Sequence, residues 1–593
     1  MKTVGLLLGE MTPPDGLPSP DRVISLSPPT DLNTQPPGLI DGEQAYGLHS
    51  LTERADDLAM KWARAVAARI EADPRWRPLM TYDQMNLHPL LVNRLFRGFF
   101  IRHARTYLSV WHILDVERPQ QVRLYTTSGA VAGFASAACH AFELPPDVIC
   151  LPGQTPSRLP IPPALNTLAR EIVAPALRHA LPAPPRRHAN LPHIVFVERG
   201  VLHAEIVARA LDALRKLCEV QITIVRFFPA PPTLVYPHAR YTDMDSYQDI
   251  STLVHLLAFQ TRVMTTRGLS VPWPKALPQS SLPSTLRFVK QVALPSIVHT
   301  LELVRRIIQI EQPNLLLTID ETGLLGKAAA LQGLRLSVPT LNVQHGVRTD
   351  SPWAEDQLFD RFATFGPSSK ETFVKRGNDP SIFIPTGAPR YDRIFRREGI
   401  KSRQQVAVEL GLDPGQPIIT FTSQRAWGRM TPIVKRETLL ALLRAWHQTD
   451  AQLVVKLRHG QPDYVPPEAS REPGWNEVKV TADYDLYDLF NASDVVVTAY
   501  STAGMEAVAM GKPLLIINLT GQPDPIPYVQ EGVAVGAYQP DQVAPALLHL
   551  LSTGRPDPNW LQCRRGFIRR HLTSDDGRSA DRLAQLMLEM MGN

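Results

Sequence analysis

Two hydroxyl residues, a glycine and a glutamate lie close together in the chain, at Ser501, Thr502, Gly504 and Glu506. The first three are expected at the amino end of a helix, where free backbone N–H groups and the helix dipole favour a phosphate group. Glu506, one turn further along, is suitably placed to accept hydrogen bonds from ribose hydroxyls. The spacing therefore suits a nucleotide diphosphate, and an ordinary capped helix with a solvated glutamate is the simpler alternative.

The residues around this cluster predict a strand, a turn, a helix and a second strand. Val495–Thr498 is an apolar run of strand length, and a stretch with helical periodicity follows it. The sequence Gly511-Lys512-Pro513 then stops the helix before the apolar run Leu514–Ile517. The cluster is thus expected at the carboxyl end of a buried strand.

A second candidate group follows the apolar stretch that begins at Thr340. This strand delivers Gln344, His345 and Gly346 at its carboxyl end, where ligands bind in α/β sheets. Gly346 is expected to permit a sharp turn that leaves His345 open to the cleft, and a histidine near neutrality can take the proton from an acceptor hydroxyl. Asp350 is close enough in sequence to orient His345 or the acceptor. A histidine bonded into a turn is the alternative.

Cations follow two predicted strands of the second half. Arg425 stands in a polar loop after one strand, and Lys456, Arg458 and His459 end the run LVVKLRHG. We expect these side chains to point at the same cleft as the hydroxyl cluster, where they would neutralise a leaving phosphate. A solvated basic strand end is the alternative.

The pattern S-D-x-x-x-T-x-Y-S-T-x-x-x-E-A-x-x-x-G-K-P at 493–513 resembles the donor-nucleotide element of GT-B glycosyltransferases. Within these it is similar to the branch of capsular polysaccharide transferases and CDP-glycerol glycerophosphotransferases. His345-Gly346 looks like the catalytic strand end of that branch, and 456–459 looks like its K-x-H-P element with Gly460 in place of proline. The resemblance implies two doubly wound α/β domains facing across a cleft, a nucleotide-activated donor and no obligatory metal.

The chain has 593 residues, of which 44% are hydrophobic and 20% charged, with a formal net charge of +5. Its length exceeds one ordinary core and predicts two or three domains. Because the Lys and Arg residues are dispersed, composition argues against a nucleic-acid partner.

Composition also bears on location. The four cysteines form no C-x-x-C pair, which favours a reduced compartment. The opening apolar run is too short for a signal peptide, and no window reaches the roughly 18 apolar residues of a membrane helix. We expect a cytoplasmic protein, free or peripheral on the inner face of the membrane. The Arg- and Phe-rich segment Arg94–His112 is the candidate for membrane contact, although a helix packed on a domain core is favoured.

Pattern changes along the chain predict five regions. Residues 1–48 are rich in proline and are expected to form a disordered tail. The others are an N-terminal helical and α/β extension (49–185), an N-terminal GT-B acceptor domain (190–395), a C-terminal GT-B donor domain (410–555) and C-terminal helices that return to the N-terminal domain (556–593).

Residues 110–152 and 304–346 resemble each other weakly at an offset of 194 positions. Each predicts helix, strand, turn, helix and strand. Because the identities are few, duplication and chance convergence both stay open.

These observations predict a glycosyltransferase that moves a sugar or polyol phosphate from a nucleotide-sugar or CDP-polyol donor to a surface-glycan or lipid-linked acceptor, without a cofactor. Asp243-x-Asp245 and Asp483-x-Asp485 match the D-x-D pattern of metal-dependent transferases, but so short a pattern arises often by chance. The alternatives are a sugar-nucleotide 2-epimerase of the same fold and a non-catalytic module that binds a nucleotide sugar.

Overall fold

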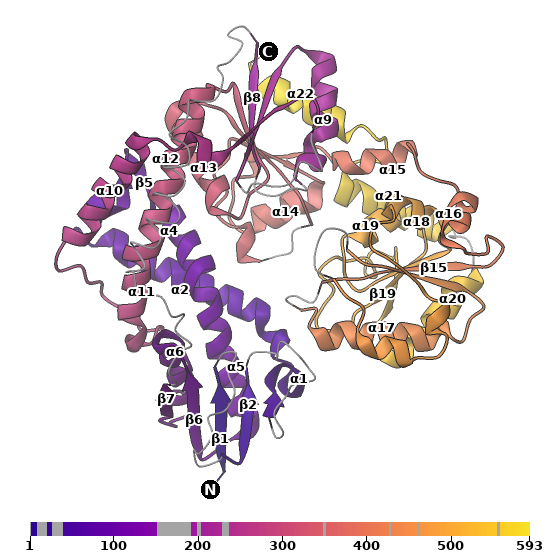
Figure 1. Ribbon diagram of the computed structural model, residues 1–593, viewed down its shortest axis with the longest axis horizontal. Coiled ribbons are helices and arrows are strands. Elements are labelled where there is room, and N and C mark those ends of the chain that lie inside the picture. Colours follow the sequence, from indigo (N-terminus) through magenta and orange to yellow (C-terminus); the bar gives the residue numbers. More distant parts are fainter. Residues whose placement is uncertain are drawn as a thin grey trace.

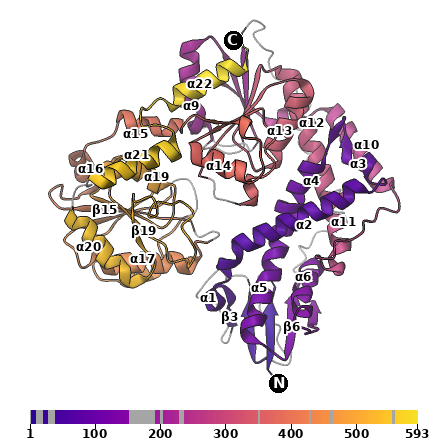
Figure 2. The same ribbon diagram turned by 180° about the vertical axis from the view of Figure 1, so that it is seen from behind.

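Three parallel sheets form the framework of the protein (Figures 1 and 2). The computed structural model describes residues 2–8, 20–26, 39–150, 191–198, 203–227, 236–347, 351–425, 429–458, 463–553 and 558–592. Helices cover the sheets, and the strands read as continuous apolar runs such as LLLT and LLII because both faces are buried. The predicted α/β class, with two doubly wound domains and an N-terminal α/β extension, is confirmed.

In each sheet the strand that comes first in the sequence lies in the middle, and later strands add on both sides of it. The N-terminal sheet has the order β3 (Leu39–Asp41), β2 (Arg22–Ser25), β1 (Thr3–Leu7), β6 (Gln121–Thr126), β7 (Asp147–Cys150). The central sheet has the order β10 (Arg240–Asp243), β9 (Gln221–Arg226), β8 (His193–Glu198), β11 (Leu315–Thr318), β12 (Thr340–Val343), β13 (Arg361–Thr364), β14 (Phe383–Pro385). The C-terminal sheet has the order β17 (Lys479–Thr481), β16 (Gln452–Lys456), β15 (Ile418–Thr422), β18 (Val495–Thr498), β19 (Leu514–Ile517), β20 (Val535–Ala537). In such sheets ligands bind beyond the carboxyl ends of the strands, where the order reverses.

The prediction of a disordered tail over residues 1–48 is wrong for the described part of that segment. Three of its stretches are the strands β1, β2 and β3, and Val4 and Leu6 are fully buried. These strands are only three to five residues long. Averaging the composition over a proline-rich segment therefore hides their apolar character.

The two segments that resemble each other in sequence occupy equivalent places in their sheets. The elements α5 (Ile101–Glu117), β6, α6 (Gly129–His140) and β7 correspond in order to α12 (Leu294–Glu311), β11, α13 (Leu324–Leu336) and β12. Both long helices follow a π-helical turn, at Phe96–Phe100 and Val289–Ala293. Both end at a residue with left-handed backbone, Arg118 (φ 44°) and Gln312 (φ 46°).

The last residues of these two helices make similar contacts as well. Glu117 accepts a hydrogen bond from the Tyr46 hydroxyl, and Glu311 accepts one from the Tyr247 hydroxyl. An α/β unit requires neither the π-helical turn nor these buried pairs, so the shared irregularities favour a repeated half-domain over chance convergence.

The N-terminal helices share one hydrophobic core with the central sheet. Residues of α2 (Thr52–Ala72) and α4 (His88–Leu95) pack in the same cluster as α12 and the strands β8 and β11. Phe96 and Phe100 are buried there, and the Phe99 ring lies 5.2 Å from that of Phe288. Residues on the two sides of the expected boundary near 185–190 therefore share one core, and the Phe residues of the segment Arg94–His112 pack inside the protein instead of facing a membrane.

Two C-terminal helices lead from the C-terminal sheet to the central one. α21 (Pro558–Leu572) packs beside α19 (Ala503–Ala509), and α22 (Ser579–Met590) lies against α9 (His203–Leu217) (Figure 2). His571 Nδ1 lies 2.8 Å from Ser368 Oγ on α14 (Pro367–Lys375), and its Nε2 lies 3.0 Å from Glu531 Oε1. This histidine therefore connects residues of both domains. None of the described helices is long and apolar enough to cross a membrane.

Candidate active site

His345 and a buried carboxylate meet where β11 and β12 end. The His345 side chain is 38% exposed, and its Nδ1 lies 3.4 Å from Oε2 of Glu321, whose side chain is fully buried. A carboxylate at one ring nitrogen orients an imidazole and leaves the other nitrogen for a proton transfer. Glu321 is not among the site residues predicted from the sequence. The available signal was its place just after the apolar strand LLLT.

The loop that carries Glu321 is shaped by its neighbours. Asp320 Oδ2 accepts a hydrogen bond of 3.2 Å from the Gly326 N–H near the start of α13. A Cβ atom added at Gly323 would lie 2.0 Å from Asp320 Oδ2, and one at Gly326 would lie 1.9 Å from the Asp320 carbonyl oxygen. Only glycine fits this close approach, which fixes the turn next to Glu321.

Gln344 determines the turn that presents His345. Its amide donates to the Gly346 carbonyl (2.8 Å) and to Ser369 Oγ (3.0 Å), and its oxygen accepts from the Phe365 N–H (2.8 Å). The chain bends at Gly346 as expected, but the φ of this residue does not lie in the left-handed region, so its backbone conformation does not require glycine. The turn is held by the buried amide of Gln344 instead.

The N-terminal helices support the loops beside this pair. The Thr322 carbonyl accepts hydrogen bonds from Asn93 on α4 (2.9 Å) and from Arg97 (2.6 Å). The Arg97 guanidinium also lies 4.8 Å from the ring centre of Trp353, whose Nε1–H donates to Asp56 on α2 (3.0 Å). The N-terminal extension, for which the sequence indicated no function, therefore supports the loops of the candidate site.

Lys327 connects two of these loops from inside the protein. Its ammonium donates to the carbonyl oxygens of Glu355 and Asp356. Burial lowers the pKa of Lys327 to about 8, although the nearby Asp356 opposes the shift. Arg64 of α2 pairs with Glu355 at 2.7 Å, so the same loop is also tied to the N-terminal helices.

The C-terminal sheet brings four of the predicted donor residues to one edge. Arg425 follows β15, Arg458 follows β16, and Ser501 and Thr502 stand between β18 and α19. Because β16, β15 and β18 are neighbours and run parallel, their carboxyl ends meet at the same edge. Both arginines are exposed there.

Ser501 caps the helix and contacts Tyr528. Ser501 Oγ accepts a hydrogen bond from the Ala503 N–H (3.2 Å), and the Ser501 carbonyl accepts from the Gly504 N–H (3.1 Å) and the Tyr528 hydroxyl (2.9 Å). A Cβ atom at Gly504 would lie 2.7 Å from the Tyr528 ring. Gly504 therefore allows close packing of Tyr528. Thr502 occupies the N-cap position of α19, but its side chain makes no capping hydrogen bond.

Lys456 does not face the cleft. Its buried ammonium donates to the carbonyl oxygens of Leu457 (2.9 Å) and Ala482. Burial lowers the pKa of Lys456. Strand alternation turns this side chain inward, whereas Arg458 comes after the strand has ended and is exposed.

Glu506 lies where the two domains touch. Its carboxylate is buried, with Oε1 3.9 Å from Nη2 of Arg390, which follows β14 of the central sheet. Arg390 also lies over the rings of Tyr391 (4.7 Å) and Phe365 (5.7 Å). Burial raises the pKa of Glu506, and the charge of Arg390 opposes this shift.

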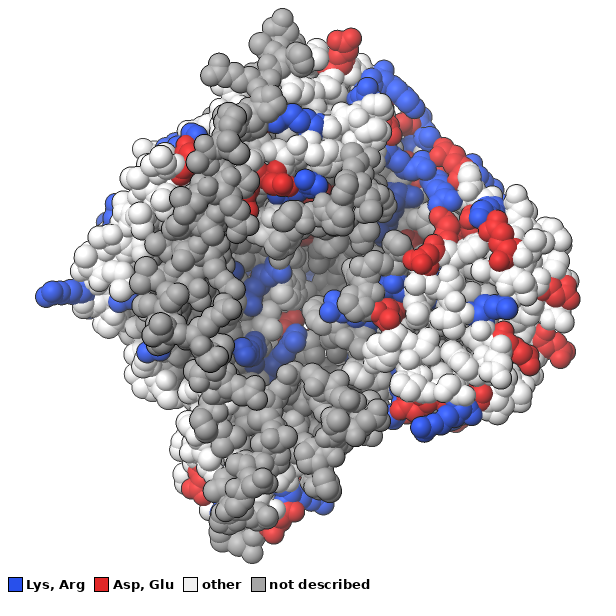
Figure 3. Space-filling model, in the orientation of Figure 1, with Lys and Arg blue, Asp and Glu red and all other residues white. Residues whose placement is uncertain are grey.

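The two edges converge across the interdomain cleft. Val347, two residues beyond His345, packs in the same cluster as Ala503 and Met505 of α19. A cavity of about 260 Å³ lies at this junction, with Val347, Ser368 and Met505 in its lining. On the face shown in Figure 3 the molecule is hollowed between its N-terminal part and the C-terminal domain, and Lys and Arg side chains stand along the hollow.

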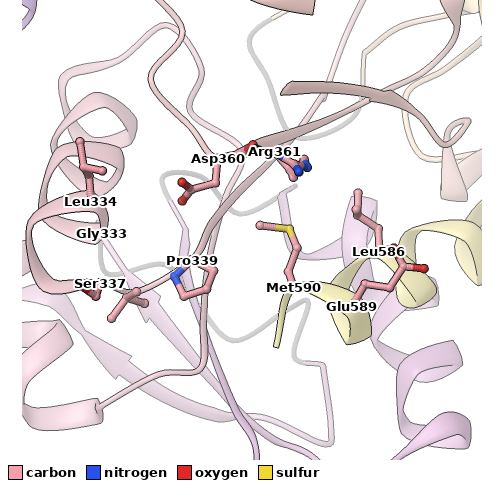
Figure 4. Close-up of a pocket in the computed structure, with 10 residues that line it drawn as sticks. Gly333, Leu334, Ser337, Pro339, Asp360, Arg361, Leu586, Glu589 and Met590 are labelled. Carbon is pink, nitrogen blue, oxygen red and sulfur yellow. Dashed lines mark hydrogen bonds between the residues drawn. The ribbon is translucent and has the colours of Figure 1, made fainter. Parts of the chain in front are cut away.

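A second cavity lies away from this cleft (Figure 4). It has a volume of about 530 Å³ and lies between α13, the starts of β12 and β13, and α22. Pro339 and Arg361 mark the amino edge of the sheet, opposite to His345, with Leu586 and Met590 across the cavity. We assign neither donor nor acceptor to it.

Two of the predicted site residues, Asp350 and His459, lie outside the described residues. Of the D-x-D carboxylates, Asp243 pairs with Arg226 (3.0 Å), and Asp485 caps α18 (Leu486–Ala492) and pairs with Arg393 (2.6 Å). Within the described ranges, no group of three or more His, Cys, Asp and Glu side chains could hold a metal ion.

Comparison with protein families addresses the C-terminal part of the chain. Residues 376–589 match the CDP-glycerol:poly(glycerophosphate) glycerophosphotransferase family. This match confirms the resemblance drawn from the sequence. The glycerophosphotransferase match contains the expected donor residues, whereas His345 and Glu321 precede it.

Among curated proteins, lipid-A-disaccharide synthase of Geobacter sulfurreducens is 26% identical over 216 residues, which are 36% of this chain and 54% of that protein. The chain thus spans about half the length of this relative. Solved structures with a similar fold include UDP-GlcNAc 2-epimerase from Neisseria meningitidis bound to UDP-GlcNAc (13% identity, 67% of this chain and 99% of that chain, TM-score 0.44). The calicheamicin glycosyltransferase CalG4 is another (16% identity, 68% and 99%, TM-score 0.42).

Proposed function

We propose that this protein transfers a sugar or polyol phosphate from a nucleotide-activated donor to a surface-glycan or lipid-linked acceptor. The observation that carries the proposal is the pair of His345 and buried Glu321 at the strand ends that face the C-terminal domain. The family match at residues 376–589 supports a donor site in the C-terminal domain. The four cysteines are free thiols, which favours a cytoplasmic location.

In the proposed reaction His345 is the general base. Its Nδ1 faces Glu321, so Nε2 takes the proton of the acceptor hydroxyl. The hydroxyl oxygen forms a bond to the anomeric carbon, or to phosphorus for a polyol phosphate donor. The bond to the nucleotide phosphate breaks, and its electron pair stays on the leaving phosphate oxygen.

The leaving phosphate is stabilised by cations and dipoles of the protein. Arg425 and Arg458 stand exposed at the edge that also carries Ser501 and Thr502. Charge-assisted hydrogen bonds to phosphate are stronger than neutral ones, and they act where negative charge develops. Glu506 is assigned to the ribose hydroxyls at the domain contact. Asp350 and His459 keep their predicted roles at the acceptor and the phosphate.

Donor binding is tested by thermal shift of the full chain with UDP, CMP, CDP, GDP and their common sugar and polyol conjugates. A ligand at a hundred times its Kd adds about 2.7 kcal/mol to the free energy of unfolding. We expect one nucleotide class to raise the melting temperature, and Arg458→Ala to weaken this shift. Arg565→Ala, an exposed arginine on α21, is the matched control. No shift with any nucleotide would overturn the donor assignment.

Catalysis is tested by replacing the base. His345→Ala should lower transfer by about 10² to 10⁴-fold while the donor still shifts the melt, because the imidazole acts on the acceptor. His549→Ala, on the exposed side of α20 (Val543–Thr553), should transfer normally. Unchanged transfer by His345→Ala would contradict the assignment, and release of free epimerised sugar without an acceptor would favour an epimerase.

A further inference from the structure

Residues 250–301 contain five Lys and Arg residues and no Asp or Glu. At the chain average of 57 acids in 593 residues, a stretch of this length would hold about five. The stretch begins with α10 (Ile250–Thr265) and continues through α11 (Leu282–Phe288) into α12. A surface built from it has the charge that attracts anions.

α10 exposes an apolar stripe to solvent. Ile250 is 80% exposed, Val254 53%, Leu257 40% and Met264 61%. These positions are four, three and seven residues apart, so they lie along one side of the helix. The opposite side is buried in the core through Leu256, Phe259 and Val263.

Three exposed cations belong to α10 or to the segment that follows it. Arg262 is exposed and donates to the Pro78 carbonyl, and Arg267 and Lys275 are exposed in the segment after α10. In the described part of the chain, no ion pair joins any of the three to an acid. We call the stripe and these cations the acid-free face; it comprises Ile250, Val254, Leu257, Met264, Arg262, Arg267 and Lys275.

Two acids that adjoin α10, Asp249 before its first residue and Glu302 beside its His255, are already engaged. Asp249, the N-cap of α10, pairs with Arg306 at 2.5 Å. Glu302 is buried and pairs with Arg305 at 2.7 Å. The local charge of the acid-free face therefore stays positive.

α10 lies on the outer edge of the molecule, on the side away from the C-terminal domain (Figures 1 and 2). The same edge is mainly white and blue in Figure 3. A flat surface that touches α10 there leaves the cleft between the domains uncovered.

We propose that the acid-free face binds the surface of an anionic lipid bilayer. A helix with apolar residues on one side and cations beside them lies in the interface, where each Lys or Arg near an anionic surface contributes about 1 kcal/mol. We select an anionic bilayer as the binding partner because of charge complementarity. The cations of the face match anionic headgroups, and its apolar side chains match the acyl chains beneath them. This inference does not depend on the transfer reaction, because binding to vesicles needs neither donor nor acceptor.

The experiment is flotation of the full chain with vesicles of phosphatidylcholine alone or mixed with phosphatidylglycerol. We expect flotation with the mixed vesicles, weakened by salt. Arg262→Gln/Arg267→Gln/Lys275→Gln should lower the partition coefficient by about fivefold for each charge removed. Val254→Ser/Leu257→Ser should lower it by about tenfold on the mixed vesicles. All these side chains are exposed, so the melting temperature should fall at most slightly, through the lost hydrogen bond of Arg262 and the lower helix propensity of serine.

Two matched controls test whether the location is correct. Leu334→Ser removes an apolar side chain that is 72% exposed on α13, and Arg565→Gln/Arg569→Gln removes two exposed cations on α21. Both should float as the unchanged protein does. Absence of flotation with mixed vesicles, or equal losses in the controls, would overturn the proposal. A dimer that Val254→Ser/Leu257→Ser dissociates would also overturn it, since a second copy would then be the occupant.

Discussion

Glu321 is a buried carboxyl group whose partner, His345, is partly exposed to the cleft. Replacing Glu321 by Gln keeps the shape of the side chain and removes the charge that stabilises a protonated imidazole. We expect kcat to fall at least about tenfold, which is less than the effect of removing the general base itself. The Kd of the donor should stay unchanged. Steady-state kinetics and nucleotide thermal shifts measure both quantities. Loss of donor binding together with kcat would instead indicate a structural role.

Glu311→Gln is the control for that change. Glu311 is also buried, but it pairs with Arg240 and Tyr247, away from His345. Breaking a buried pair leaves an uncompensated charge, so this variant should lose stability. Its kcat per folded molecule should stay the same.

We predict that Lys327 makes the free energy of unfolding depend on pH. Its pKa in the folded protein is about 8, below the ordinary value of 10.5. Between these values the unfolded chain binds more protons than the folded one, so the free energy of unfolding rises with pH. Below about pH 8 both states hold the proton and this contribution is flat. Burial also lowers the pKa of Lys512 to about 8, so part of the rise is common to both proteins. Urea unfolding of the protein and of Lys327→Met across this range should show a steeper rise with Lys327 present; parallel curves would contradict it.

At the level of elements, the end of β12 is held to β13 and α14 by the Gln344 amide. Gln344→Ala leaves the Phe365 N–H and the Gly346 carbonyl without this partner, at a cost of about 2 to 4 kcal/mol. We expect a lower melting temperature and reduced transfer, because the turn that presents His345 is released.

Gln332→Ala is the matched change for comparison. Gln332 is a buried glutamine of α13, and its amide donates to the Leu301 carbonyl. It should lose less stability, with transfer by the folded fraction unchanged. Equal effects on transfer in the two variants would show that the turn at Gln344 has no specific role in presenting His345.

At the level of the whole molecule, the N-terminal half-domain and the central sheet form one core. A chain that begins at residue 191 would expose the apolar faces that α2, α4 and α5 cover. We therefore expect such a chain to be insoluble or to melt without cooperativity, because a large part of its apolar surface is no longer removed from water. Calorimetry of the shortened and full chains tests this. A cooperative melt at the same temperature would contradict the shared core.

The two copies of the pseudo-repeat share an architecture but differ in the residue at the position of Glu321. The central copy places Glu321 after β11, whereas the corresponding position in the N-terminal copy, at the offset of 194, is Thr127 after β6. The N-terminal copy therefore lacks this carboxylate. The helices that precede this copy, α4 and α2, instead hold the loops at Thr322 and Trp353.

Local pattern was sufficient to predict several elements from the sequence. The strand, turn, helix and strand around Ser501 are β18, α19 and β19, and Gly511, with φ 75°, ends the helix. The strand that ends before Gln344 is β12. Apolar periodicity and helix-stop signals act over a few residues, so they can be read without knowledge of the fold.

Only the tertiary structure decided which side chains meet. Glu321 reaches His345 because β11 and β12 are neighbours, and Lys456 turns to carbonyl oxygens because its strand is buried on that side. The strands β1 to β3 are too short to stand out in sequence, but they complete a sheet with β6. These contacts join residues that are far apart in the sequence. The burial and strand pairing that stabilise them form only when the chain has folded, so a local sequence pattern does not reveal them.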